Sequence, residues 1–180
     1  MANTSLNGWA GIRLRVDPRL RTITIPGTAG TKITMRREVA PLFAAYLADW
    51  HRLMPKRLNL NEGTKAYGWI YREARSGAGL SNHASGTATD CRWDVLKADG
   101  KPHMTDAEKA ILNKILDTYK TADGHRVLAN GEWWQHADGM HSEISQSWDR
   151  GCKRNTTPAD VAQVIARLKI NKDGVRPIGA

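Results

Sequence analysis

The sequence predicts an α+β domain in which about three helices cover a small, mostly antiparallel sheet. Short segments such as IRLRV and TITI alternate polar and apolar side chains, as half-buried strands do. Three longer segments instead space their apolar residues at the period of a helix. The two kinds of segment are grouped along the chain rather than strictly alternating, which favours an antiparallel over a parallel sheet.

The first third of the chain predicts a strand pair followed by a helix. Residues 12–25 contain two strand-like segments joined by a turn, and the segment IPGTAGTK that follows is typical of a loop. Residues 36–54 carry apolar side chains at helical spacing: Val39, Phe43, Tyr46, Leu47, Trp50 and Met54. Pro41 is compatible with this helix only near its start, and Pro55 ends it.

The middle of the chain predicts two more strands and a capped helix. Residues 66–72 and 88–95 are expected to be strands on either side of a glycine-containing loop. Thr105 and Glu108 have the spacing of a capping box, in which each side chain accepts a hydrogen bond from the backbone of the other residue. The helix that they open is expected to end near residue 120.

The last third predicts two short strands, a helix and a tail. Residues 126–129 and 139–145 are expected to be the strands. Thr157 is expected to cap the helix, with Pro158 at its first position. Residues 171–180 are expected to form a loose tail.

Size and composition predict one globular domain over residues 1–180, with a core from about residue 6 to 170. The hydrophobic content of 41% disfavours wholesale disorder. No apolar run is long enough to span a bilayer, so membrane insertion is not expected. The N-terminus MANTSLNGWAGIRLRV lacks the basic and apolar regions of a secretory signal. We therefore expect a monomer that is made in a cytoplasm.

The charge and the cysteines restrict the choice of partners. The net charge of +9 is compatible with an ordinary solvated surface or with attraction to a polyanion. The basic residues are scattered and no nucleic-acid motif accompanies them, so nucleic-acid binding is not expected. Cys91 and Cys152 lack the spacing of a zinc-ligand pair and are expected to be free thiols, with Cys91 buried as a small hydrophobe.

Two short segments carry the residues of a metal site. SNHASGTATD places His83 and Asp90 seven positions apart around a turn of small residues, and DGMH places Asp138 three positions before His141. Two histidines and one carboxylate can bind zinc while leaving its fourth position to water. A further carboxylate beside that water can take its proton. We therefore predict a hydrolase with Zn²⁺ held by His83, Asp90 and His141.

The base that removes the proton has two candidates. Asp138 is favoured, although residues three apart on a regular strand face opposite ways. It must therefore lie on a turn before the strand of His141, which Gly139 permits; the alternative is an ordinary turn aspartate. Glu132 and His136, in the string EWWQH, form a rival pair of base and ligand.

The strings HASGTATD (residues 83–90) and DGMHSE (residues 138–143) together resemble a known family. It is the family of zinc D-Ala-D-Ala carboxypeptidases and L-alanoyl-D-glutamate endopeptidases, in particular its endolysins from phages of actinobacteria. The resemblance covers most of residues 6–150. It implies a fold like that of the D-Ala-D-Ala peptidases and the hedgehog signalling domain. The vancomycin-resistance dipeptidases of the family have glutamate where this chain has Asp138.

The resemblance implies a zinc peptidase that cuts the stem peptides of bacterial peptidoglycan, most simply between L-alanine and D-glutamate. Removal of a terminal D-alanine, as in the carboxypeptidases, is the alternative. The resemblance also implies cell-wall degradation during host lysis, after release by a holin. A zinc-bearing module that binds the wall without cutting it stays open, as the hedgehog domain illustrates, although Asp138 disfavours it.

Four further side chains are candidates for the substrate site or its support. By the resemblance, Arg72 contacts the substrate carbonyl or carboxylate, with Arg75 close to it in sequence. Ser81 is expected to contact substrate or to cap its own loop. One tryptophan is expected to line the substrate groove: Trp134 is favoured, and Trp133 and Trp148 are the alternatives. Glu143 is expected to orient a ligand imidazole, or else to form a surface ion pair.

Overall fold

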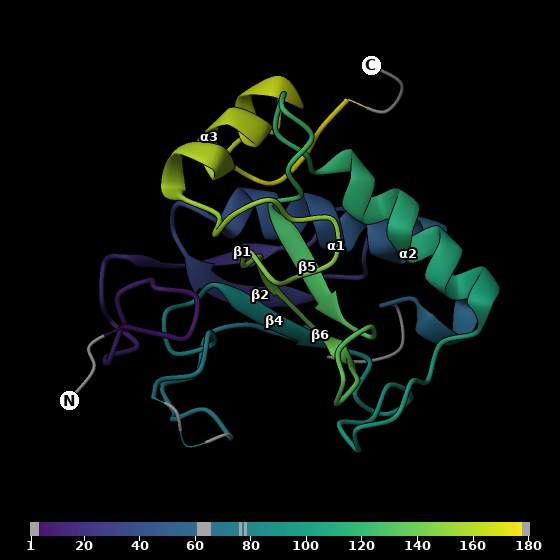
Figure 1. Ribbon diagram of the computed structural model, residues 1–180. Helices are drawn as coiled ribbons and strands as arrows, with labels where there is room; N and C mark the ends of the chain where they lie inside the picture. Colours follow the sequence, from purple (N-terminus) through teal and green to yellow (C-terminus); the bar gives the residue numbers. More distant parts are fainter. Residues whose placement is uncertain (1–3, 61–65, 76, 78, 178–180) are drawn as a thin grey trace.

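The computed structural model describes residues 4–60, 66–75, 77 and 79–177. Over these residues it is an α+β fold with three α-helices and six strands, which confirms the predicted fold class (Figure 1). The strands are β1 (Leu20–Thr24), β2 (Lys32–Arg36), β3 (Ala66–Tyr67), β4 (Ala88–Cys91), β5 (Leu128–Gly131) and β6 (Asp138–Ile144). The helices are α1 (Ala40–Leu53), α2 (Asp106–Thr118) and α3 (Pro158–Arg167), with a short 3-10 turn at Lys56–Leu58.

The strands form two antiparallel sheets. β1 and β2 make a hairpin, and the second sheet has the order β3-β4-β6-β5. β4 lies between β3 and β6, and all of its residues are buried. Its pairing with β6 places Asp90 directly opposite His141. The register of this central pair therefore brings together side chains that lie about fifty positions apart in the sequence.

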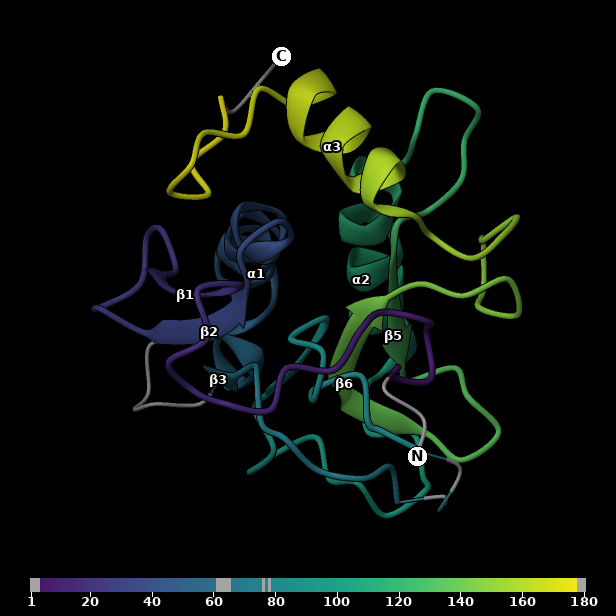
Figure 2. The same cartoon turned by 90° about the vertical axis from the view of Figure 1, so that its left-hand side faces the viewer.

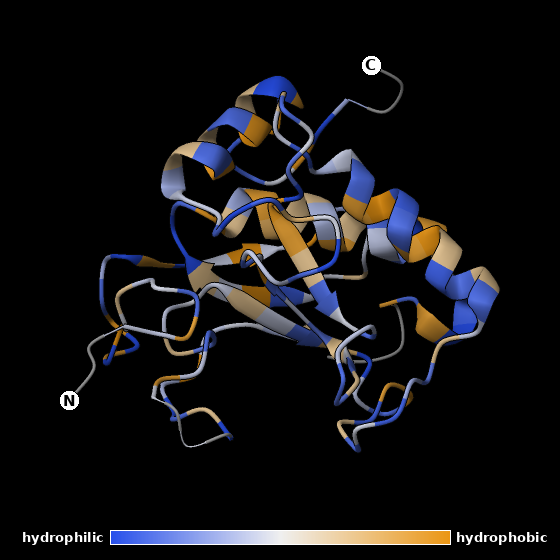
Figure 3. Cartoon of the chain, in the orientation of Figure 1, coloured by the Kyte–Doolittle hydropathy of each residue, from blue (hydrophilic) through white to orange (hydrophobic). Residues whose placement is uncertain are grey.

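The core is built around α1, which packs against the hairpin, α2 and α3. Figure 2 looks along this helix and shows the hairpin and α3 on different sides of it. Tyr46 and Trp50 of α1 are fully buried, and the ring of Tyr46 meets the rings of Trp50 and Tyr119 edge-on at centroid distances of 6.1 and 6.0 Å. Figure 3 shows apolar residues recurring along α2 and β5, whose buried sides complete this core.

Both predicted helix caps are present. The Thr105 hydroxyl accepts from the backbone of Glu108, and the Glu108 carboxylate accepts from the backbone of Thr105. Thr157 and Asp160 form the same reciprocal pair at the start of α3. Each pair satisfies two backbone N–H groups that have no partner within the helix.

The hairpin does not use the segments expected for it. Residues 12–16 are irregular, with Leu14 and Val16 63% and 87% exposed, because the backbone of Ile12 donates to Ala84 rather than to a strand. The partner of β1 is instead β2, part of which was expected to be loop. Their register pairs Ile23 with Ile33, and both side chains are buried. Burial of these two isoleucines against α1 therefore outweighs the local pattern.

Other boundaries also differ from the prediction. The strand expected over residues 88–95 ends at Cys91, because Arg92 takes a left-handed backbone conformation with φ of 56°. β3 is likewise shorter than expected. Cys91 itself is free and fully buried in the core, as predicted. None of the described helices is long and apolar enough to cross a membrane.

The C-terminal segment is not loose over residues 171–177. Arg176 forms an ion pair of 2.8 Å with Asp49 of α1, and Gly174 lies so close to Ala44 that a Cβ atom on it would clash. Arg21 of β1 also pairs with Asp173 at 2.7 Å. The tail therefore packs on α1 and the hairpin, which its polar composition did not indicate; residues 178–180 lie outside the described part.

Candidate metal centre

The turn between Ser81 and Thr87 buries His83 completely. Two backbone hydrogen bonds tighten it, from Ala84 to the carbonyl of Ser81 and from Gly86 to the carbonyl of His83. Gly86 has φ of +71°, and a Cβ atom there would lie 2.6 Å from the backbone nitrogen of Arg36. Only glycine fits this position, since both the conformation and the contact with β2 exclude a side chain. The motif glycine thus anchors the turn that presents His83.

His83, Asp90 and His141 converge on one point inside the fold. His83 Nε2 lies 3.1 Å from Asp90 Oδ1 and 3.2 Å from His141 Nδ1. His141 Nδ1 lies 2.9 Å from Asp90 Oδ1. All three residues are buried, and together they can hold a metal ion. The structure therefore brings together the three ligands that the sequence predicted.

The spacing of the three atoms fits a tetrahedral ion. Ligands at about 2.0–2.1 Å from such an ion lie about 3.3 Å from one another. The observed separations of 2.9–3.2 Å come close to this value without any rearrangement of the backbone. Two imidazoles and one carboxylate are also the donor set of many catalytic zinc sites.

Hydrogen bonds on the far side of each imidazole fix which nitrogen faces the ion. His83 Nδ1 lies 2.7 Å from the carbonyl oxygen of Gly68, and His141 Nε2 lies 2.8 Å from Glu143 Oε2. Both partners are acceptors, so each of these nitrogens carries the proton. His83 Nε2 and His141 Nδ1 are left with the lone pairs that a metal requires.

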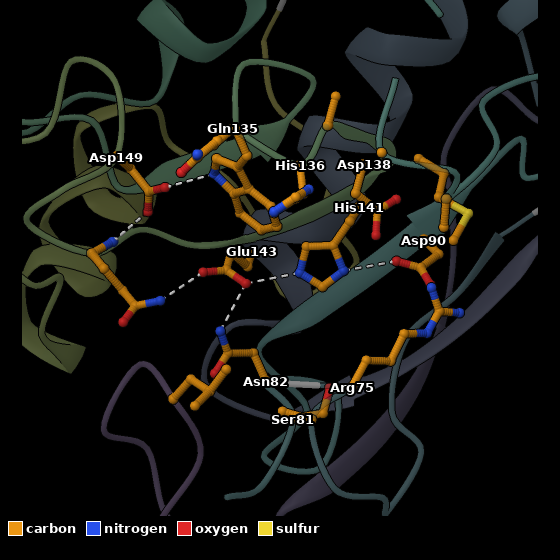
Figure 4. Close-up of a pocket in the computed structure, with 18 of the residues that line it drawn as sticks. Arg75, Ser81, Asn82, Asp90, Gln135, His136, Asp138, His141, Glu143 and Asp149 are labelled. Atoms are coloured by element: carbon orange, nitrogen blue, oxygen red, sulfur yellow. Dashed lines mark hydrogen bonds and ion pairs between the residues drawn. The ribbon is translucent and has the colours of Figure 1, made fainter. Parts of the chain in front are cut away.

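Glu143 is the buried acceptor that holds His141, as the sequence suggested. Its carboxylate also accepts from the side-chain amides of Asn82 at 2.7 Å and Gln146 at 2.9 Å (Figure 4). Burial opposes ionisation of Glu143, but hydrogen bonds from His141 and the two amides outweigh it and lower the pKa. Burial opposes protonation of His141, but Asp90 and Glu143 raise its pKa to about 10. Without a metal, the His141 ring therefore carries a second proton on Nδ1, and a bound metal would displace it.

Tyr67 holds the other oxygen of Asp90. Its hydroxyl donates to Asp90 Oδ2 at 2.5 Å, and its ring stacks on the His83 imidazole with 5.2 Å between centroids. Burial and the adjacent carboxylate raise the pKa of Tyr67 to about 12, so it keeps the proton that it donates. Burial opposes ionisation of Asp90, but its close contacts with His141 and His83 outweigh it and lower the pKa of Asp90. Asp90 is therefore an anion that turns one oxygen toward the ion.

Asp138 lies beside this group with an unpaired oxygen. It lines the same pocket as Asp90 and His141, and Figure 4 shows its side chain next to the His141 ring. Asp138 Oδ1 is buried and has no hydrogen-bond partner among the described residues. Burial raises the pKa of Asp138. A buried, unpaired carboxylate oxygen is costly, so its position next to the ligands favours a role in binding or chemistry.

The strand geometry around Asp138 differs from the expectation. Asp138 is the first residue of β6 and not part of a preceding turn. The pairing of β5 with β6 shifts by three residues between Asn130, which pairs with Ser142, and Gly131, which pairs with Asp138. This irregularity breaks the alternation of faces, so Asp138 and His141 both line the pocket although they are three positions apart.

The rival pair of base and ligand lies elsewhere. The Glu132 carboxylate accepts from the backbone of Met104 at 3.0 Å and lies 3.6 Å from Lys109 Nζ, on the side away from the pocket. His136 is exposed at the pocket edge and does not belong to the group of three ligands. Glu132 thus caps the loop before α2, and the geometry favours Asp138.

The pocket lined by Asp90, Asp138 and His141 has a volume of about 850 Å³. Its wall includes the three predicted substrate residues, Arg72, Ser81 and Trp134. Arg75 and the two alternative tryptophans, Trp133 and Trp148, also line it. Ser81 is buried and its hydroxyl accepts from the backbone of His83 at 3.3 Å, so it caps its loop as well as lining the pocket. The Trp134 ring lies 5.4 Å from the His141 ring, and Trp134 Nε1 donates to Asp149.

Sequence reasoning missed several residues that support the site. Tyr67, Asn82 and Gln146 contact the ligands or Glu143, yet none has a diagnostic spacing. Asn82 is adjacent to His83 in the motif, which is the only available signal. The carbonyl of Gly68 belongs to the backbone and leaves no trace in the sequence.

Comparisons of the chain with protein-family models and with curated proteins, and of its fold with solved structures, found no match.

Proposed function

We propose that this protein is a zinc metallopeptidase that hydrolyses the stem peptides of bacterial peptidoglycan. One observation carries the proposal: three buried donor atoms lie 2.9–3.2 Å apart at a pocket lined by Asp90, His141 and Asp138, and Asp138 Oδ1 has no partner among the described residues. This combination of donor set and adjacent base is what hydrolytic zinc sites require. The choice of peptidoglycan rests on the resemblance of HASGTATD and DGMHSE to the phage endolysins.

Each residue of the pocket has a part in the proposed reaction. Zinc held by the three ligands would activate a substrate carbonyl and a water molecule. Asp138 accepts the proton of the attacking water and passes it to the leaving amine. Its raised pKa, caused by burial, makes it a better proton acceptor than an exposed aspartate. Arg72 and Arg75 provide positive charge for a substrate carboxylate or carbonyl oxygen.

The proposed bond is the one between L-alanine and D-glutamate. Release from the cytoplasm by a holin, and action as a monomer on the cell wall, belong to the same proposal. Removal of a terminal D-alanine is the alternative within the same family. The two reactions leave different products, because the first creates a new N-terminal glutamate or isoglutamine and the second releases free alanine.

The decisive experiment is mass spectrometry of actinobacterial peptidoglycan after incubation with the zinc-loaded protein. We expect new N-terminal D-glutamate or isoglutamine ends with the wild type and none with Asp138→Asn. Glu132→Gln is the matched control, since Glu132 is a nearby buried carboxylate that faces away from the pocket, and we expect it to keep turnover.

The other outcomes separate the alternatives. Loss of terminal D-alanine would identify a carboxypeptidase. Turnover by Asp138→Asn together with loss of turnover in Glu132→Gln would reverse the choice of base. Zinc binding without any product from the wild type would contradict the peptidase and favour a non-catalytic wall-binding module.

A further inference from the structure

Asn7 is distant in sequence from the metal ligands, yet buried hydrogen bonds connect it to His141. The backbone N–H of Asn7 donates to the side-chain oxygen of Asn82 at 2.9 Å. The side-chain nitrogen of Asn82 donates to Glu143 Oε2 at 2.7 Å, and the same oxygen accepts from His141 Nε2 at 2.8 Å. Figure 4 shows the last two contacts as dashed lines between Asn82, Glu143 and His141.

The two ends of this connection fix the orientation of the Asn82 amide. A backbone N–H can only donate, so the Asn82 atom that faces Asn7 is the oxygen. An ionised carboxylate such as that of Glu143 can only accept, so the Asn82 atom that faces it is the nitrogen, beside the donors from His141 and Gln146. If the contact with Asn7 were lost, Glu143 alone would hold the Asn82 amide in this orientation, and the Asn82 oxygen would lose its donor.

The segment that carries Asn7 is anchored to the motif turn by its own contacts. The Asn7 side chain donates to Thr87 Oγ1 at 2.9 Å and to the carbonyl of Ile144 at 3.3 Å. The hydroxyl of Ser5 bonds to that of Ser85 at 2.8 Å. Asn7 is only 6% exposed and the partners of both side chains are buried, so water does not readily replace a lost contact.

We infer that Asn7 and Asn82 are positioning residues for the metal ligand His141. They hold Glu143 in place, and Glu143 keeps the His141 proton on Nε2, so that Nδ1 faces the ion. Partners that orient a ligand imidazole in this way raise metal affinity, because the ring needs no reorientation on binding. The inference rests on the metal binding proposed above and extends the site to the N-terminal segment.

The test compares the zinc affinity of three variants with that of the wild type by competition with a chelator. Asn82→Asp keeps the shape of the side chain but places an acceptor against Glu143. Asn7→Ala removes the side-chain contacts that dock the segment. Asn171→Asp is the control: it adds the same charge in the C-terminal segment, and its oxygen can still accept from Asp173 and Val175.

We expect Asn82→Asp to weaken zinc binding about 10- to 100-fold, and Asn7→Ala about tenfold, at the lower end of the range for such partners. Asn171→Asp is expected to bind as the wild type does. A second measurement follows the Nε2–H signal of His141 in a long-range ¹H–¹⁵N spectrum of the zinc-loaded protein. That signal is expected to shift or exchange faster in the two site variants, which a purely structural defect elsewhere would not cause.

Wild-type affinity and an unchanged His141 signal in folded Asn82→Asp would overturn the inference and leave the metal site intact. If Asn82→Asp does not fold, Asn7→Ala decides the question by the same two measurements. A wild-type protein that binds no zinc would instead contradict the proposed function, and with it the inference. The two failures are therefore distinguishable.

Discussion

Replacement of Asp138 by asparagine is expected to remove turnover and, at the same time, to stabilise the metal-free protein. Asp138 Oδ1 is buried without a partner among the described residues, and an unsatisfied buried polar group costs about 1–3 kcal/mol, more when it is charged. Asparagine keeps a polar atom at this position but removes the buried negative charge, and this relief is the source of the expected gain in stability. The residue is partly exposed, so we take the lower end, about 1 kcal/mol. For a domain of this size, that gain raises Tm by about 2–4 °C.

The sign of the effect follows from the pKa. Burial raises the pKa of Asp138 above that of an unfolded aspartate, so the fold favours the protonated form. This stabilising contribution is complete below the unfolded pKa of about 3.9 and is lost as pH rises through the folded pKa. Asparagine does not ionise, so the variant loses no stability from this position as pH rises. The advantage of Asp138→Asn is therefore expected at pH 7 and should shrink toward pH 4.

The assay combines thermal unfolding of chelator-treated protein at pH 4 and pH 7 with turnover and zinc affinity. Turnover is expected to fall about 10²–10⁴-fold, the usual contribution of a general base. Zinc affinity is expected to change little, because Asp138 is not among the three ligands. A variant that is clearly less stable than the wild type at pH 7, or that keeps full turnover, would refute the reasoning.

Three further predictions concern the fold and its pH dependence. Gly86→Ala is expected to lower Tm and zinc affinity together. The new Cβ atom would clash with the Arg36 backbone, and the positive φ costs a non-glycine residue about 1–3 kcal/mol. An unchanged thermal unfolding curve would contradict this. Thr157→Ala is expected to cost about 1 kcal/mol in a denaturant titration by loss of a helix cap, while zinc affinity stays the same. Burial raises the pKa of Asp149 to about 6, so its stabilising contribution is lost as pH rises from about 4 through 6. Asp149→Asn should therefore flatten the dependence of Tm on pH over this window, and parallel curves for the two proteins would reject that assignment.

The features predicted correctly from the sequence depend on neighbours along the chain. The capping box at Thr105 involves residues three positions apart, so its spacing is enough to predict it. The cap at Thr157 was likewise predicted from its place directly before Pro158, and the structure adds its reciprocal partner Asp160. The apolar residues that α1 buries recur at helical spacing, and the turn around Gly86 involves only neighbouring residues, so both features could be predicted from short stretches of sequence. The same holds for His83 and Asp90, whose separation by a tight turn already indicates that both side chains could bind the same metal ion.

The hairpin shows where local pattern was not enough. Residues 12–16 alternate polar and apolar side chains, yet they form no strand, since Leu14 and Val16 have nothing to pack against. Residues 32–36 were expected to begin in a loop, and they pair with β1 because Ile33 and Met35 are buried there. Strand pairing depends on which surface buries the side chains, and that surface is made by distant residues.

The sequence by itself determined the fold class, the helices with their caps, and the three side chains that could hold a metal ion. The tertiary structure alone decided that Asp138 rather than Glu132 faces the ligands, through the shift in register between β5 and β6. It also decided which side chains contact this group: Tyr67 bonds to Asp90, and Asn7 bonds to Asn82, which bonds to Glu143. The physical reason is that hydrogen bonds and strand registers join positions that lie far apart along the chain, such as Asn7 and Ile144, whereas spacing along the chain reports only on neighbours.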